Sequence, residues 1–269
     1  MKNTVKTRII AVLFSLMMIL CCLSVTMMKK NEGVVAMADT STYVNVLSNE
    51  RTRTSFNAGW KFIRSHVLGA TETSFNDSNW ETVSLPHTWN RDDCTTRSYY
   101  RGKAWYRKTF DVETKSAYAQ ANKRLWVEFE ACGQYAEVYV NGQLVGEHIG
   151  GYSAFRFDIT DFLSDTGNNT IAILADNSGN GSTISPFGMD FDIWGGLYRD
   201  AWLIETSGVM VDMEDYGSSG LYLSGTKNEN SNNWNLNVSS KIVNASGQDV
   251  TVEAEIMQSG LPYIKSVLT

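Results

Sequence analysis

Residues 135–145 read YAEVYVNGQLV, and this stretch decides the fold of the chain. Every second position of its first half is apolar, which is typical of a strand with one buried face. The residues on that face are Ala136, Val138 and Val140. Asn141 and Gly142 follow, and a second apolar run begins at once. A two-residue Asn-Gly connection predicts a β-hairpin, because its type I′ turn requires positive φ at both positions.

Further short apolar runs lie on both sides of this hairpin. They span residues 104–112, 125–130, 155–159, 170–175 and 199–205. One helical turn is expected at Thr160 to Leu163, and no long run with a 3.6-residue period follows the first 38 residues. Short strands at this spacing predict an all-β sandwich or barrel. The roughly 150 residues from 55 to 207 suffice for a core of their own.

The character of the sequence changes after residue 207. Strand-like runs continue at 221–223, 235–243 and 250–256, between stretches rich in Gly, Ser and Asn. The remaining chain has about 60 residues, fewer than the roughly 100 of an immunoglobulin-like sandwich. We therefore expect residues 208–269 to hold the first strands of a second, incomplete β-sandwich.

The first 38 residues have the organisation of a secretory signal. Three basic residues precede an apolar run over 9–28, and an Ala-x-Ala pattern ends at Ala38. This order is typical of a signal peptide cleaved after Ala38, which predicts a secreted or cell-surface protein. Because the run is long enough to cross a bilayer, an uncleaved membrane anchor is the alternative. Residues 39–54, rich in Ser, Thr and Asn, are expected to be a linker.

Removal of the leader would make the remaining chain strongly acidic. The whole chain carries −6, and the leader carries +4 from five basic residues and Glu32, so residues 39–269 carry −10. No cluster of Lys and Arg offsets this charge. The composition therefore argues against nucleic acid or an anionic membrane surface as a partner.

Cysteine and histidine are few in this sequence. Only Cys94 and Cys132 follow the leader, and they either pair in an oxidising compartment or stay as two buried thiols. His66, His87 and His148 lack the spacing of a zinc site. No nucleophile elbow, phosphate-binding loop or dinucleotide-binding fingerprint occurs.

A second informative stretch is 186–200, which reads PFGMDFDIWGGLYRD and runs into an apolar strand. Aromatic rings stack on the apolar faces of pyranoses, and carboxylates accept hydrogen bonds from sugar hydroxyls. The stretch is therefore a candidate sugar site. An aromatic corner of a β-sandwich core is the alternative.

The two carboxylates of this stretch do not have the arrangement of a glycosidase pair. Such a pair lies about 5–9 Å apart across the scissile bond. Asp190 and Asp192 would be same-face neighbours on one extended segment. Neighbours of this kind rarely form a glycosidase carboxylate pair. We expect no catalytic acid in this chain.

Ordered motifs across residues 56–207 resemble glycoside hydrolase family 2. They are LPHTWN at 85–90 with YRGKAWYRK at 100–108, AEVYVNG at 136–142 with GGY at 150–152, FDITDFL at 157–163, and DF at 190–191 with GGLYRD at 195–200. Residues 208–258 resemble the start of the family's immunoglobulin-like second domain.

The resemblance implies a jelly-roll, galactose-binding-like sandwich over residues 55–207 and a partial immunoglobulin-like sandwich over 208–269. In the full enzymes a (β/α)₈ barrel follows and carries both catalytic glutamates. None of that barrel is in this sequence, so we expect a non-catalytic amino-terminal portion that is inactive alone. Its expected partners are a carbohydrate and the missing barrel, and the full enzyme is expected to form a homo-oligomer.

The resemblance also implies sugar-contacting residues. The motif that closes the domain (the closing motif, GGLYRD at 195–200) resembles the form found in β-galactosidases, whereas β-glucuronidases tend to carry His where this chain has Tyr198. Asp190 is then expected to contact a galactose hydroxyl and, as in some members, a sodium ion; a carboxylate suits both roles. Asn90 is a second candidate sugar contact, and Trp194 is expected to pack in the core or against another domain. No cofactor is expected in this portion, and sodium or magnesium only in the full enzyme.

Three interpretations of function remain open at this point. The first is the amino-terminal portion of a secreted β-galactosidase, which would hydrolyse terminal β-D-galactosides. The second is a free-standing carbohydrate-binding module. The third is an interaction fragment that assembles with a separately encoded barrel polypeptide. Within the first interpretation, a β-glucuronidase or a β-mannosidase is the alternative to a β-galactosidase.

Overall fold

A computed structural model describes residues 34–36, 51–91, 93, 99–179, 194–227, 229, 234–247, 249–258 and 261–268. The chain divides into two compact units. The larger unit comprises residues 50–208 with 216–218, and the smaller unit comprises the rest. Across the described ranges, no helix has both the length and the apolar character needed to cross a bilayer.

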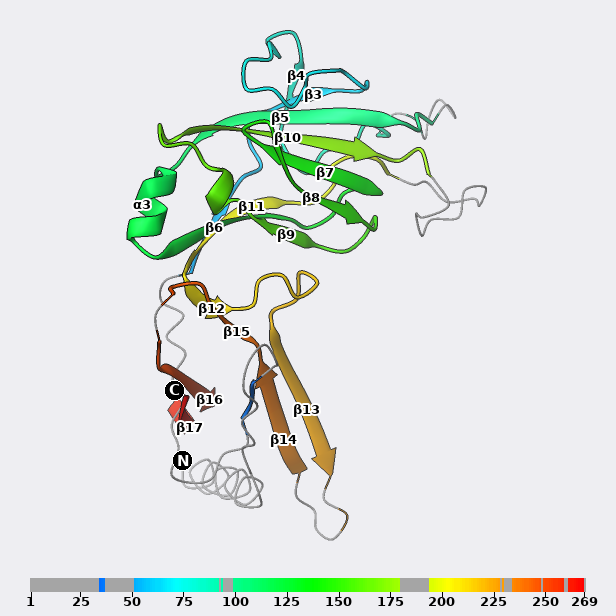
Figure 1. Ribbon diagram of the computed structural model, residues 1–269. Helices are drawn as coiled ribbons and strands as arrows, with labels where there is room; N and C mark the ends of the chain where they lie inside the picture. The colour runs from blue at the N-terminus through cyan, green and yellow to red at the C-terminus, as the bar shows by residue number, and fades with distance from the viewer. Residues whose placement is uncertain are drawn as a thin grey trace, which may run out of the picture. The chain divides into compact units, whose positions relative to one another are not determined.

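The larger unit is a sandwich of two antiparallel sheets, seen as two stacked layers in Figure 1. The first sheet has the strand order β4-β3-β5-β10-β7-β8. Its strands are β3 Trp60–Ile63, β4 Glu81–Val83, β5 Lys103–Asp111, β7 Tyr135–Val140, β8 Gln143–Ile149 and β10 Asn168–Asp176. The second sheet has the order β2-β11-β6-β9. Its strands are β2 Thr52–Ser55, β6 Lys123–Phe129, β9 Phe155–Asp158 and β11 Ala201–Ser207. The prediction of an all-β, jelly-roll sandwich is confirmed.

The predicted hairpin is present as β7 and β8. Val140 pairs with Gln143, which leaves a two-residue connection. Asn141 and Gly142 have φ of 50° and 82°, as a type I′ turn requires. Side chains along β7 alternate between half-buried and buried, and the buried ones are the three apolar residues predicted.

The core of the larger unit lies between the two sheets. Tyr106 of β5 and Ile173 of β10 face Val127 and Phe129 of β6, and all four are buried. A smaller apolar cluster around Trp105 covers the opposite face of the six-stranded sheet. Central strands β5 and β10 are therefore buried on both faces, which explains their long runs of buried residues.

Short helical segments also interrupt the described strands of the larger unit. The predicted helical turn is a 3₁₀ helix, Thr160–Phe162. The sequence did not predict α3, Lys115–Gln120, which starts at an N-cap where Thr114 accepts a hydrogen bond from the Ala117 amide. A helix of six residues is too short for a periodic apolar pattern to be recognised.

The smaller unit is also built from strands. They are β1 Val34–Ala36, β12 Val209–Val211, β13 Leu221–Lys227, β14 Trp234–Ser240, β15 Ile242–Asn244, β16 Val252–Gln258 and β17 Leu261–Leu268. Sheets form in the orders β1-β14-β13, β12-β15 and β16-β17. Two features differ from expectation. Strand β1 lies inside the predicted leader and pairs with β14, and β17 forms a hairpin where no strand was predicted.

Candidate functional site

The candidate sugar stretch is described only in its second half. Asp190, its neighbours up to Ile193, and Cys94 lie outside the described residues. The predicted galactose and sodium contacts of Asp190 therefore stay predictions. The described chain runs up to residue 179 before this region and resumes at Trp194.

Asn90, the second predicted sugar contact, is buried, with 5% of its surface exposed. Its Nδ2 donates to Asp93 Oδ2 at 2.5 Å and to the Tyr100 carbonyl at 3.1 Å. Its Oδ1 accepts from the Gly195 amide at 2.7 Å and from Asn177 Nδ2 at 3.2 Å. Both ends of the amide are thus engaged by protein groups, and the sugar-contacting role stays a prediction.

The hydrogen bonds of Asn90 join three segments that are distant in sequence. Asp93 also accepts from the Tyr100 amide at 3.1 Å, which holds the 90–100 segment together. Asn177 Oδ1 accepts from the Gly102 amide at 2.9 Å. The described segments that end at residue 179 and begin at Trp194 are therefore both fixed to the same buried amide.

The Gly pair of the closing motif is required by close packing. A Cβ on Gly195 would overlap the Trp89 ring and lie 2.7 Å from Asn177 Nδ2. Gly196 has φ of 98°, and a Cβ there would lie 2.9 Å from the His87 carbonyl. The Gly133 amide also donates to the Gly196 carbonyl at 3.0 Å. Only glycine permits this approach of backbone to ring.

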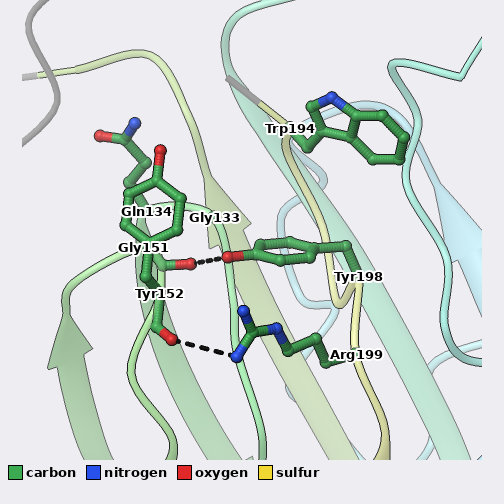
Figure 2. Close-up of a pocket in the computed structure, with 7 residues that line it drawn as sticks. All are labelled: Gly133, Gln134, Gly151, Tyr152, Trp194, Tyr198 and Arg199. Atoms are coloured by element: carbon green, nitrogen blue, oxygen red, sulfur yellow. Dashed lines mark hydrogen bonds between the residues drawn. The ribbon is translucent and has the colours of Figure 1, made fainter. Parts of the chain in front are cut away.

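A cavity of about 230 Å³ opens directly beside this pair. Its described lining residues are Gly133, Gln134, Gly151, Tyr152, Trp194, Tyr198 and Arg199. Figure 2 shows Trp194, Tyr198 and Arg199 along one side and Gln134, Gly151 and Tyr152 along the other. The closing motif therefore forms one wall, and residues just before β7 and just after β8 form the other.

Two hydrogen bonds cross between these walls (Figure 2). The Tyr198 hydroxyl donates to the Gly151 carbonyl, and Arg199 Nη1 donates to the Tyr152 carbonyl at 3.4 Å. Burial raises the pKa of Tyr198 above its usual range, although the neighbouring Arg199 opposes the shift. The hydroxyl therefore keeps the proton that it donates across the cavity.

Two aromatic side chains of the cavity are exposed. Trp194 is 51% exposed and Tyr152 is 65% exposed. Trp194 therefore does not pack in the core of this domain, and the other expectation, that it packs against another domain, stays a prediction. Large rings left in solvent beside a cavity are typical of a binding surface, because stacking a ligand on them removes apolar area from water.

The side chain of Gln134, in contrast to these exposed rings, is buried. It is 2% exposed, and among the described residues neither Nε2 nor Oε1 has a hydrogen-bond partner. A buried amide without partners costs about 1–3 kcal/mol. Sequence analysis missed this residue because nothing in its local pattern sets it apart. Tyr152, in contrast, was part of a quoted motif.

Cys132 immediately precedes two residues that line the cavity, Gly133 and Gln134. Cys132 is a free, buried thiol whose pKa burial raises well above its usual range. Among the described residues, no group of three or more His, Cys, Asp or Glu side chains could hold a metal ion.

The family comparison places most of this unit in one family. A family model described as "Glycosyl hydrolases family 2, sugar binding domain" matches residues 55–207. This match includes every described residue that lines the cavity.

Curated relatives carry two different activities in their names. A putative β-glucuronidase of Formosa agariphila is 36% identical over 231 residues, which cover 82% of this chain and 27% of that protein. A β-galactosidase of Thermoanaerobacter pseudethanolicus is 38% identical over 161 residues, covering 55% of this chain and 20% of that protein. The chain spans about a quarter of the length of the curated relatives it matches.

A solved structure also matches this chain. The crystal structure of a Bacteroides uniformis β-glucuronidase superposes with a TM-score of 0.68 at 34% identity. The match covers 76% of this chain and 24% of that one.

Proposed function

This chain belongs to glycoside hydrolase family 2 and contains the amino-terminal sugar-binding domain of such an enzyme, and from this premise we propose that it is part of a longer β-glucuronidase. The observation that carries the proposal is the 36% identity to a putative β-glucuronidase over 82% of this chain. The fit to a solved β-glucuronidase at 34% identity supports it as well.

A β-galactosidase is the second candidate. The 38% identity to a Thermoanaerobacter pseudethanolicus β-galactosidase favours it, although that match covers a smaller share of this chain. Tyr198, at the position before Arg199, favours it too, because the resemblance predicts His there in β-glucuronidases. Catalysis belongs to the rest of the enzyme under either assignment, and this domain shapes the wall of the substrate site.

The assignment is tested by expressing the coding DNA with its continuation beyond codon 269. The purified product is assayed on nitrophenyl β-D-glucuronide and nitrophenyl β-D-galactoside in parallel. We expect turnover of the glucuronide and little of the galactoside. Preference for the galactoside would transfer the assignment to the second candidate. A continuation without a hydrolase domain would instead support a free-standing carbohydrate-binding module.

Export is a separate part of the proposal. Sequencing the amino terminus of the protein recovered from the culture medium should begin at Asp39. Recovery in the membrane fraction with an intact start at Met1 would support an uncleaved anchor instead.

A further inference from the structure

We propose that His148 is a pH-responsive clamp on one wall of the cavity: its neutral ring holds the segment Gly150–Tyr152, and its protonation releases that segment. The segment lies between the end of β8 at Ile149 and the start of β9 at Phe155, outside the paired strands. The inference rests on the proposed function only in that this wall would belong to the substrate site. The clamp itself is argued from contacts inside the larger unit.

Three consecutive backbone carbonyls of this segment each accept a hydrogen bond from a side chain. The carbonyls are those of Gly150, Gly151 and Tyr152, and their donors, in the same order, are His148, Tyr198 and Arg199. His148 Nε2 lies 3.0 Å from its acceptor, and Arg199 Nη1 lies 3.4 Å from its own. Figure 2 shows the two bonds that come from the closing motif. Side chains therefore hold the carbonyls of this wall.

The segment depends on these donors because its backbone has unusual conformational freedom. Two of its three residues are glycine, and Gly150 has a φ of 142°, which other residues rarely adopt. Fixing such a backbone costs more conformational entropy than fixing that of other residues. The Tyr152 side chain recovers little of this cost by burial, because it is 65% exposed. Each carbonyl bond therefore contributes a large share of the order of this wall.

Neutral His148 carries its proton on Nε2. A carbonyl oxygen only accepts, so the ring nitrogen that faces Gly150 must be the donor. The Ser153 hydroxyl lies 3.4 Å from the same nitrogen. Among the described residues, Nδ1 has no hydrogen-bond partner. The neutral ring thus already makes the one bond that the segment needs, and a second proton would find no acceptor there.

The surroundings of His148 favour the neutral ring over the charged one. The ring is half-buried and stacks on Phe155, with the ring centroids 4.1 Å apart and an angle of 13° between the planes. Its cross-strand neighbour on β7 is the buried Ala136. Burial lowers the pKa of His148 below its ordinary 6.5, while the Gly150 carbonyl partly opposes the shift.

The charged residues of the flanking elements do not offset this effect. Glu147 of β8 and Glu137 of β7 are paired with each other on the opposite face of their sheet. Arg156 of β9 is engaged by a carboxylate of β6. Arg199 of the closing motif is itself a cation. A proton on His148 therefore gains no ionic partner among the described residues.

Acid should therefore release the wall. A protonated ring is better solvated in water than against Phe155, so it leaves its site and the segment loses one donor. The other two donors do not change charge in this range, because burial raises the pKa of Tyr198 and a guanidinium keeps its charge. The clamp is complete above pH 6.5 and is lost as pH falls through the lowered pKa of His148.

The test is NMR spectroscopy of the 269-residue chain, labelled with nitrogen-15, at about pH 7.5 and about pH 5. The backbone order parameters of residues 150–153 should be about 0.85 at the higher pH and below about 0.6 at the lower one. The amide of Ile173, in the central strand β10, should stay rigid at both, which shows that the fold is intact. Long-range correlations of the imidazole should show the proton of neutral His148 on Nε2.

Substitutions of His148 separate a clamp from a merely structural role. His148→Gln places a non-titrating amide donor near the position of Nε2, so the segment should stay rigid at both pH values. His148→Ala removes the donor, so the segment should be mobile at both. His66→Gln replaces an exposed histidine of the same unit and is the matched control. This variant should keep the pH response of the parent.

Two results would overturn the inference: a segment that stays rigid at about pH 5 in the parent, or one that loosens equally in His148→Gln. Neither measurement uses a substrate, so both are independent of the hydrolysis assay. A longer product that cleaves galactosides would end the β-glucuronidase proposal and leave a measured clamp intact. A wall that is rigid at both pH values would end the clamp and leave the β-glucuronidase proposal as it stands.

Discussion

At the scale of single residues, the same side-chain group can either bind a ligand or stabilise the fold, and its neighbours decide which. Asn90 lies in a motif that resembles a sugar-binding enzyme, yet its amide is buried among Asp93, Asn177 and Gly195. Gln134 carries the same functional group and has no partner among the described residues. The chemistry of the two side chains is equal, and only their surroundings differ.

Asn90→Ala should destabilise the larger unit. Removal of the amide leaves buried polar partners unsatisfied, at about 1–3 kcal/mol each, so we expect a loss of roughly 3 kcal/mol in the free energy of unfolding. Urea titration followed by tryptophan fluorescence measures it. Asn168→Ala is the matched control, because Asn168 is exposed and its side chain donates to Asp111 Oδ1 at 2.8 Å, on the surface of the unit. Equal losses for the two variants would contradict the structural role of Asn90.

His87 should make stability depend on pH. Burial lowers its pKa below 6.5, while Glu81 partly opposes the shift, and its Nδ1 lies 2.8 Å from the Tyr106 hydroxyl. The unfolded chain therefore takes up the proton first as pH falls. This contribution to stability is complete above pH 6.5 and is lost as pH falls toward the lowered folded value.

Substitution tests this dependence. His87→Gln should reduce the loss of unfolding free energy between neutral and mildly acidic pH, as measured by urea titrations across that range. His148→Gln should act in the same direction, because burial lowers the pKa of His148 too, with partial opposition from the Gly150 carbonyl. If the unfolding free energy of His87→Gln falls with pH as steeply as that of the parent, His87 does not cause the pH dependence.

At the scale of elements, local sequence and local structure agree best in hairpins. The turn between β7 and β8 depends on two residues with positive φ, and the neighbouring alternation sets which face is buried. Elsewhere, tertiary contacts shift the ends of strands from the positions that the sequence predicts. The strand expected at 199–205 is Ala201–Ser207, because Arg199 faces the cavity and Asp200 accepts from Asn57 at 2.9 Å.

Gly142→Ala should lower the free energy of unfolding by roughly 1–2 kcal/mol. The backbone at this position has a φ of 82°, which strains an alanine. Steric overlap adds little, because the nearest atom to a new Cβ is the Thr71 carbonyl oxygen at 3.6 Å. Gly151→Ala is the control, with no positive φ and a nearest contact of 3.5 Å. Thermal unfolding should separate the two, and equal midpoints would argue against the strain.

At the scale of the whole molecule, the two units differ in how much they bury. The larger unit has a continuous core between two sheets. In the smaller unit, every side chain of β13 is exposed. Leu221 and Leu223 share one face of this strand and lie opposite Ser240 and Val238 of β14. A strand with so little burial contributes little to stability.

Limited proteolysis should therefore leave a resistant core that ends between residues 207 and 220. The lower limit is the end of β11, and the upper one follows Ser218, whose carbonyl accepts from Arg156 at 2.7 Å. Mass spectrometry of the fragments locates the cut. Equal resistance through residue 269 would show that the smaller unit is as stable as the larger.

The 269-residue chain should show no turnover of nitrophenyl β-D-glucuronide or β-D-galactoside. The resemblance places both catalytic glutamates in a barrel that this sequence does not contain. The measurement is a chromogenic assay of the purified chain, with the longer product as the positive control. Turnover by the pure chain would mean that catalysis is not confined to the barrel.

The sequence by itself determined the strand-rich fold, the hairpin at 135–145 and the family. These features follow from alternation, from a turn that demands particular residues, and from ordered motifs, all of which are local in the chain. Tertiary structure alone decided that Asn90 is buried, that Trp194 is exposed and that Gln134 lines a cavity. Those facts depend on contacts between segments as distant as Asn90 and Gly195. Burial and hydrogen-bond partners arise from such contacts, and no local pattern encodes them.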